Sequence, residues 1–355
     1  MICRVCCNRA YEKIASFELV VKNSSGAEGG NEPTAQDIRS GNRRALARAI
    51  TLIESEREDH RAVAQALLEQ LLPDTGQAVR IGVSGPPGVG KSTFIEAFGL
   101  YLTGIGKHLA VLAVDPSSAL SGGSILGDKI RMERLAREPG VFIRPSPAAG
   151  VTGGVARRTR EAMLACEAAG FDVVLIETVG VGQSEAAVAD LVDLFALLVQ
   201  PGGGDDLQGI KRGIMELADL VVVTKADGDL RDLARLTEVD YRSALTLIRG
   251  RGEGPRPHVL SCSAVEECGM DEVWQAVETY RAALGDTGEL ARKRAAQATS
   301  WMWREVEERV VTALRGDPGL AKLSERLQRE VADGRKTPST AAAGILAAFR
   351  KTPGN

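Results

Sequence analysis

One stretch of the sequence combines three glycines with a lysine and a serine: Gly85-Pro-Pro-Gly-Val-Gly-Lys-Ser92. It lies between an apolar run, residues 79–84, and a helix-like run, residues 93–101. A strand, the pattern G-x-x-x-x-G-K-[ST] and a helix, in that order, predict a P-loop, whose backbone N–H groups bind phosphate oxygens. Lys91 is then expected to contact the β and γ phosphates, and Ser92 to bind Mg²⁺. A glycine-rich turn without a ligand is the alternative, but strand, loop and helix all agree with the P-loop.

Acidic residues end two later apolar runs, Asp115 after the P-loop helix and Glu177 further along the chain. Because ligands of parallel sheets bind beyond the carboxyl ends of the strands, these carboxylates are expected beside Ser92, holding Mg²⁺ directly or through its waters. For Asp115, a cap on a following helix is the alternative. Asp128 is a further candidate in the loop after Asp115. The predicted metal residues are therefore Ser92, Asp115, Asp128 and Glu177.

Three loops at residues 115–132, 178–185 and 201–211 are rich in glycine. Glycines at this density cost entropy on ordering, which indicates loops that change conformation, with plain surface connections as the alternative. In the second loop, Gly180 allows a backbone N–H to reach a γ-phosphate, as in nucleotide switches. The predicted catalytic residues are Lys91, Asp128, Glu177 and Gly180.

Two further strand ends carry residues that suit a guanine base. Thr224-Lys-Ala-Asp227 resembles the N-K-x-D element of GTPases, with Thr224 where that element usually has Asn. Asp227 would accept hydrogen bonds from the guanine ring N–H and amino group, which adenine cannot supply, so GTP is predicted over ATP. Ser263-Ala264-Val265 resembles the loop that supports the base through backbone groups. The predicted nucleotide contacts are Ser84, Gly85, Pro86, Pro87, Gly88, Val89, Gly90, Lys91, Ser92, Thr93, Lys225, Asp227, Ser263, Ala264 and Val265.

Apolar runs alternate with helix-like runs over residues 77–285, which predicts an α/β fold whose mainly parallel sheet is covered by helices. Before this domain, residues 34–76 predict two helices as an appendage, and residues 1–33 are a weakly structured leader. Residues 286–355 predict a helical tail that packs on the nucleotide domain or on a second copy of itself. The expected strands are 79–84, 109–115, 141–144, 171–177, 194–199, 220–224 and 257–261.

Composition disfavours several classes of partner. A net charge of −3 with 4% aromatic residues indicates neither a nucleic-acid binder nor a membrane-surface protein. No apolar run approaches the roughly 20 residues that span a bilayer. The six cysteines do not form a disulfide framework, which favours the cytoplasm. Cys3-x-x-Cys6 lacks a second pair, so an incidental N-terminus is favoured over a metal site.

Together these motifs resemble the methylmalonyl-CoA mutase-associated GTPases known as MeaB or ArgK. The most specific stretches are residues 114–132, 177–185 and 203–211. The resemblance implies a homodimeric G-protein chaperone with a C-terminal dimerisation tail that binds GTP or GDP and Mg²⁺. It further implies that the protein binds an adenosylcobalamin-dependent mutase, gates its cofactor loading by hydrolysing GTP slowly, and protects it from inactivation.

Three other functions remain as alternatives at this point. A nickel-insertion GTPase needs a segment rich in His or in paired Cys and His, and the chain has three His. A protein kinase of an amino-acid transport system needs a general base for an acceptor hydroxyl, and none stands out. A nucleotide sensor without catalysis is the third.

Overall fold

The computed structural model describes residues 32–115, 132–147, 152–178, 184–202, 212–249 and 257–350. Within these ranges seven strands form one sheet in the order β3-β2-β4-β1-β5-β6-β7, and every neighbouring pair is parallel. The predicted mainly parallel α/β fold is thus confirmed, with an all-parallel sheet. The strands are β1 (Val79–Ser84), β2 (Leu109–Asp115), β3 (Val141–Pro147), β4 (Val173–Thr178), β5 (Leu194–Val199), β6 (Leu220–Val223) and β7 (His258–Ser261).

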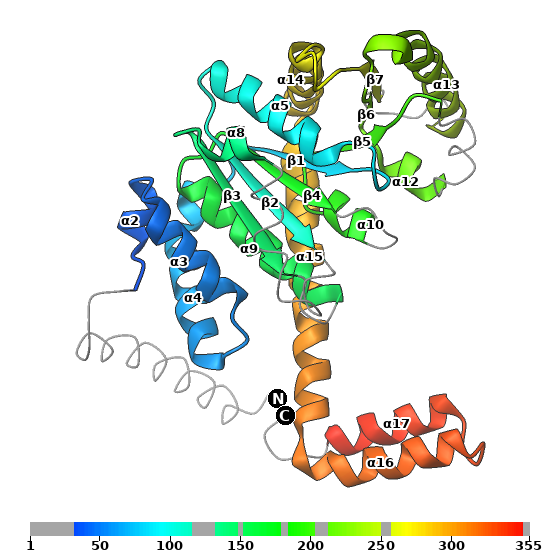
Figure 1. The fold of residues 1–355 in the computed structure, drawn as a ribbon. Coiled ribbons are helices and arrows are strands. Elements are labelled where there is room, and N and C mark those ends of the chain that lie inside the picture. Colours follow the sequence, from blue (N-terminus) through cyan, green and yellow to red (C-terminus); the bar gives the residue numbers. More distant parts are fainter. Residues whose placement is uncertain are drawn as a thin grey trace.

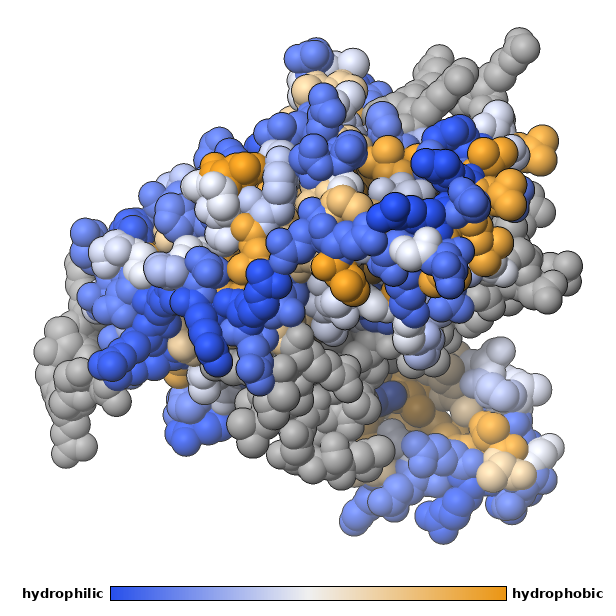
Figure 2. Space-filling model, turned by 45° about the horizontal axis from the view of Figure 1, so that its top comes forward, coloured by the Kyte–Doolittle hydropathy of each residue, from blue (hydrophilic) through white to orange (hydrophobic). Residues whose placement is uncertain are grey.

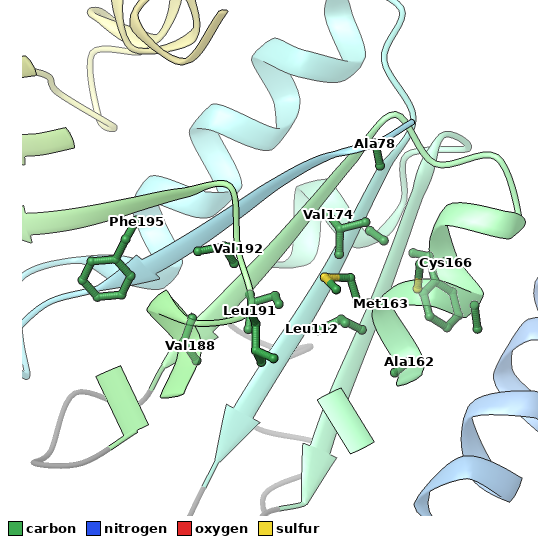
Figure 3. Packing of buried hydrophobic residues seen from close by; sticks show 14 of the residues in the cluster. Ala78, Leu112, Ala162, Met163, Cys166, Val174, Val188, Leu191, Val192 and Phe195 are labelled. Atoms are coloured by element: carbon green, nitrogen blue, oxygen red, sulfur yellow. The ribbon is translucent and has the colours of Figure 1, made fainter. Parts of the chain in front are cut away.

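Helices cover both faces of this sheet (Figure 1). One face packs against α5 (Lys91–Gly104), α8 (Glu133–Ala136) and α14 (Met270–Asp286), through a core that includes Phe98 and Trp274. The other face packs against a second set of helices, through a core that includes Met163, Cys166 and Phe195 (Figure 3). That second set is α9 (Thr152–Ala168), α10 (Ser184–Ala189), α12 (Arg212–Leu217) and α13 (Arg231–Arg249), with the 3₁₀ turn η2 (Gly228–Leu230) ahead of α13. Burial on both faces explains why the strands are continuously apolar in sequence.

The N-terminal segment has more helices than the sequence predicts. Three α-helices form instead of two: α2 (Ala35–Arg39), α3 (Arg43–Glu54) and α4 (Glu58–Leu71), followed by the 3₁₀ turn η1 (Leu72–Asp74). The extra boundary has a local cause, because Gly41 adopts a φ of +74° and the Asn42 side chain accepts hydrogen bonds from Arg44 N and Ala45 N. The prediction of two helices is therefore wrong. Ile38, Leu46 and Ile50 join the core beside α9.

The C-terminal helices are α15 (Glu289–Gly316), α16 (Pro318–Ala332) and α17 (Pro338–Phe349). The first half of α15 is fixed to the sheet domain, because the Arg294 guanidinium donates to both carboxylate oxygens of Asp193 (2.8 and 2.6 Å) and to Ala78 O (2.8 Å). The second half extends beyond the sheet and leads to the α16–α17 hairpin (Figure 1). In the described ranges, no helix is long and apolar enough to cross a bilayer.

Gly82, at the centre of β1, has no side chain, which allows the core residues on the α10 side of the sheet to pack closely against the strand. A Cβ at this position would lie 2.9 Å from Val188 Cγ1 and 3.1 Å from Phe195 Cδ2. We expect Gly82→Ala to lower the free energy of unfolding by about 1–3 kcal/mol, because the core must shift to admit the methyl group. Urea denaturation without nucleotide measures this.

Gly104→Ala is the matched control, since a Cβ at the end of α5 meets nothing within 4 Å. We expect that variant to be unchanged or slightly more stable. Equal stability of the two variants would contradict the packing described for β1.

Candidate nucleotide site

The predicted P-loop joins β1 to α5. Gly85 is needed there because a Cβ would lie 2.6 Å from Leu198 O of β5. Gly90 adopts a φ of +97° and is the N-cap of α5, where no side chain caps the helix. The first backbone N–H groups of α5, with the positive end of its dipole, therefore remain available to an anion at this loop.

Lys91 places its ammonium against the loop. Its Nζ donates to Gly85 O at 2.8 Å and to Pro86 O at 3.2 Å. Burial lowers the pKa of Lys91 from the usual lysine value, while the carboxylates of Glu177 and Glu185 act in the opposite direction. A half-buried cation held by backbone carbonyls is a suitable partner for phosphate oxygens entering the loop.

Ser92 and Glu177 meet beside the loop. Ser92 Oγ donates to Glu177 Oε1 at 3.3 Å, and Glu177 is buried, with 8% of its surface exposed. The parallel register of β1 and β4 causes this proximity, because Val83 pairs with Glu177. A hydroxyl and a carboxylate are hard oxygen ligands that suit Mg²⁺, which binds few protein groups and keeps its remaining positions for water and phosphate. The two residues therefore fit the predicted ion.

The other predicted metal and catalytic residues are less completely placed. Asp115 ends β2 one residue beyond the Val114–Thr178 pair, and its side chain lies outside the described atoms. Asp128 and Gly180 lie outside the described residues. In the described part of the chain, no three His, Cys, Asp or Glu residues gather as a metal cluster.

The predicted base-recognition element is tied directly to the P-loop. Thr224, which is buried, donates through Oγ1 to Val89 O at 2.7 Å and contacts Val199 O at 3.1 Å. Lys225 adopts a φ of +57° and donates through Nζ to Gly88 O at 2.8 Å. Because the Val89 carbonyl is held toward Thr224, the Gly90 N–H in the same peptide plane points the other way. Thr224 thus binds the loop although it replaces the usual Asn.

Asp227 and the loop after β7 form the far side of the site. Ser263 Oγ donates to Asp227 Oδ2 at 2.5 Å and accepts from Glu266 N at 3.1 Å, while the Ala226 N–H donates to Cys262 O at 3.0 Å. These bonds fix the Asp227 carboxylate at the sheet edge. Of the predicted support loop, Ser263 is fully buried, Ala264 is half-buried and Val265 is 81% exposed.

The structure therefore brings the P-loop together with Glu177 on one side and with Thr224 to Asp227 and Ser263 on the other. Two further contacts were not predicted from the sequence. Thr178 Oγ1 donates to Ser84 Oγ at 2.9 Å, which joins the end of β4 to the start of the loop. Glu185, buried in the first turn of α10, acts electrostatically on Lys91. The position of Glu185 at the end of the glycine-rich stretch 178–185 was the sequence feature that could have indicated this role.

Comparisons with known proteins agree with this geometry. A family model described as methylmalonyl Co-A mutase-associated GTPase MeaB matches residues 46–318. A probable GTPase of Mycobacterium tuberculosis (strain H37Rv) is 53% identical over 312 residues, 88% of this chain and 93% of that protein. The mouse protein named methylmalonic aciduria type A homolog, mitochondrial, is 50% identical over 320 residues, 87% of this chain and 77% of that protein. A solved structure described as a LAO/AO transport system kinase is 38% identical with a TM-score of 0.72, covering 91% of this chain and 100% of that one.

Thr224→Val tests the tie between the base element and the P-loop. We expect the free energy of unfolding to fall by about 1–3 kcal/mol, because Val89 O loses its buried hydroxyl donor, whereas Val199 O keeps the backbone N–H of residue 224. GDP binding should weaken as well, since the loop carbonyl is no longer held. Urea denaturation and calorimetric GDP titration measure the two effects.

Thr224→Ser keeps the hydroxyl and removes one methyl group, so its GDP affinity should stay close to that of the wild type. A Val variant that bound GDP as tightly as the Ser variant would show that the hydroxyl does not shape the loop.

Proposed function

Because the chain belongs to the MeaB family of methylmalonyl Co-A mutase-associated GTPases, we propose that it is a G-protein chaperone of an adenosylcobalamin-dependent methylmalonyl-CoA mutase. In this role it hydrolyses GTP to GDP and phosphate, gates loading of the mutase cofactor and protects the mutase from inactivation. The observation that carries the nucleotide part is the pair of bonds from Thr224 and Lys225 to consecutive P-loop carbonyls. Through them, the element that selects the base also holds the loop that binds phosphate.

Different residues of the site have different roles in binding and hydrolysing GTP. Lys91 binds β and γ phosphate oxygens and favours the charge that develops on them during hydrolysis. Ser92 and Glu177 hold Mg²⁺, which when bound draws negative charge from the phosphates. Asp115 and Asp128 complete the proposed metal residues, and Gly180 offers its N–H to the γ-phosphate.

Asp227→Asn tests base selection. The Asp227 carboxylate only accepts hydrogen bonds, whereas the amide nitrogen of Asn donates them. The variant therefore suits xanthine, because xanthine has a carbonyl at C2 where guanine has its amino group. We expect GTP affinity to fall about tenfold to a hundredfold and xanthosine triphosphate to bind better than GTP. Calorimetric titration of both nucleotides, and of ATP, with Mg²⁺ measures this.

Asp229→Asn, two residues further along on the exposed η2 turn, is the matched control and should keep the preference for GTP. If the wild type bound ATP as tightly as GTP, or if Asp227→Asn kept its GTP affinity, the assignment of Asp227 to the guanine would be wrong.

We also propose that two copies assemble through the C-terminal tail. Trp303, Val306 and Val310 lie at positions i, i+3 and i+7 of α15, on one side of the helix, and are 57%, 41% and 46% exposed. Hydrophobic residues also lie on the surface of the tail at the lower right of Figure 2. Leu346 of α17 is 46% exposed. An apolar stripe on a helix that leaves its domain suits a self-complementary contact.

We propose the cytoplasm as the location, supported by the free thiols of Cys166, Cys262 and Cys268 among the described residues. The net charge of −3 supports partners other than nucleic acid or a membrane surface.

The mutase proposal is tested by adding a purified adenosylcobalamin-dependent methylmalonyl-CoA mutase to the chain. We expect the slow GTP hydrolysis to change in rate and light scattering to detect a complex. The chain alone should have about twice its single-chain mass of 37.7 kDa. An unchanged rate with no complex would overturn the partner proposal and leave the GTPase assignment intact.

A kinase is the second candidate, because the solved structure at 38% identity carries that description. Transfer of labelled γ-phosphate to a protein instead of to water in the same assay would favour it. Release of all label as inorganic phosphate would exclude it. In the described residues, nothing gathers as a metal cluster that would favour nickel insertion.

A further inference from the structure

A pocket lies away from the P-loop, on the sheet face that carries α9 and α10. Its volume is about 290 Å³, near the lower end of the range for small-molecule sites. Three elements line it. Arg157 and Arg160 come from α9, Ala187 and Leu191 from α10 and its end, and Trp301 from α15.

Two buried N–H groups in this lining lack a partner. Arg157 Nε and Trp301 Nε1 are inaccessible and make no hydrogen bond. Trp301 as a whole is buried, with 8% of its surface exposed. Because a buried donor without an acceptor is costly, these two atoms mark a part of the lining whose polar groups the chain satisfies incompletely.

The Arg160 guanidinium also lines the pocket. Its Cζ lies over the Trp301 ring, 5.0 Å from the ring centre, and no carboxylate of the described residues is within ion-pair distance of it. Burial lowers the pKa of Arg160, which reflects the cost of enclosing this charge. The other pocket arginines differ, because Arg304 pairs with Asp190 (2.6 Å) and Arg157 approaches Glu305 (3.7 Å).

The rest of the lining restricts the charge and shape of an occupant. The three arginines are balanced by three acids, Asp190, Glu305 and Glu308, so the lining has no excess positive charge and disfavours a polyphosphate. Ala186, Ala187, Leu191 and the Trp301 ring add an apolar wall. A planar carboxylate matches the fork of the Arg160 guanidinium, and a short hydrocarbon chain matches that wall.

We propose that this pocket binds a small aliphatic carboxylate, held by the Arg160 guanidinium beside the Trp301 ring. A ligand in this pocket would lie between two helices, α10 and α15. α10 begins at Ser184, directly after the segment that contains Gly180, and α15 continues into the α16–α17 tail. An occupant therefore contacts both the helix that follows the nucleotide loop and the helix that leads to the tail.

Trp301 supplies the readout. Replacing the other two tryptophans, in the double variant Trp274→Phe/Trp303→Phe, leaves Trp301 as the fluorophore of the full chain. We expect titration with sodium butyrate, at ionic strength kept constant with sodium chloride, to give a saturable change in its emission. In the same background, Arg160→Gln should weaken butyrate binding about tenfold or more, and Arg160→Lys should be intermediate.

Arg315→Gln, an exposed arginine near the end of α15, is the matched control and should bind butyrate as the background does. GDP titration by calorimetry verifies that each variant is folded, because the P-loop lies outside the pocket. Butyrate should also raise the thermal midpoint of the wild type and leave that of Arg160→Gln unchanged.

Three results would overturn the proposal. They are the absence of a saturable response to butyrate, an equal response to inorganic phosphate at the same ionic strength, and an unchanged affinity in the folded Arg160→Gln variant.

Discussion

The hydrogen bonds to the carbonyl oxygens of the P-loop are the interactions on which the nucleotide site depends. Lys91 binds the carbonyls of Gly85 and Pro86 within the loop, and Thr224 and Lys225 bind those of Val89 and Gly88. The glycines of the loop have little conformational preference of their own, so these donors help to set its shape. Since a trans peptide plane carries its N–H opposite its C=O, holding the carbonyls of Gly88 and Val89 also orients the N–H groups of Val89 and Gly90.

The order of the sheet explains why these donors are available. β1 lies between β4 and β5, and β6 and β7 follow, so the carboxyl ends of five strands meet around one loop. The chain leaves β1 toward one edge for β2 and returns past β1 to reach β5, which is the reversal of strand order where ligands of open parallel sheets bind. Glu177 lies on β4, on one side of β1, and Thr224 and Asp227 follow β6 on the other side. The sheet thus brings together residues that are far apart in sequence.

The helices that flank the site connect it to the rest of the molecule. α15 is held to the sheet by Arg294 and Asp193, and its Gln297 donates to Val192 O at 2.9 Å beside α10. The tail that α15 carries is thus attached through buried polar contacts, and those contacts are directional. Changes at α10 and changes in the tail therefore share one helix, α15, which supports the proposal that a partner responds to the nucleotide state.

The sequence by itself determined the strands, their parallel arrangement, the P-loop and the family, because each is encoded by local order: apolar runs, glycines at fixed spacing and polar residues at strand ends. It did not determine the break at Gly41 and Asn42, where one hydrogen-bonded cap outweighs a continuous helical pattern. Only the tertiary structure decided that Thr224 serves the loop in place of Asn, that Ser263 positions Asp227, and that Arg160 and Trp301 enclose a pocket. Those contacts join residues from different strands and helices, and strand order and helix packing, which local spacing does not specify, decide which of them meet.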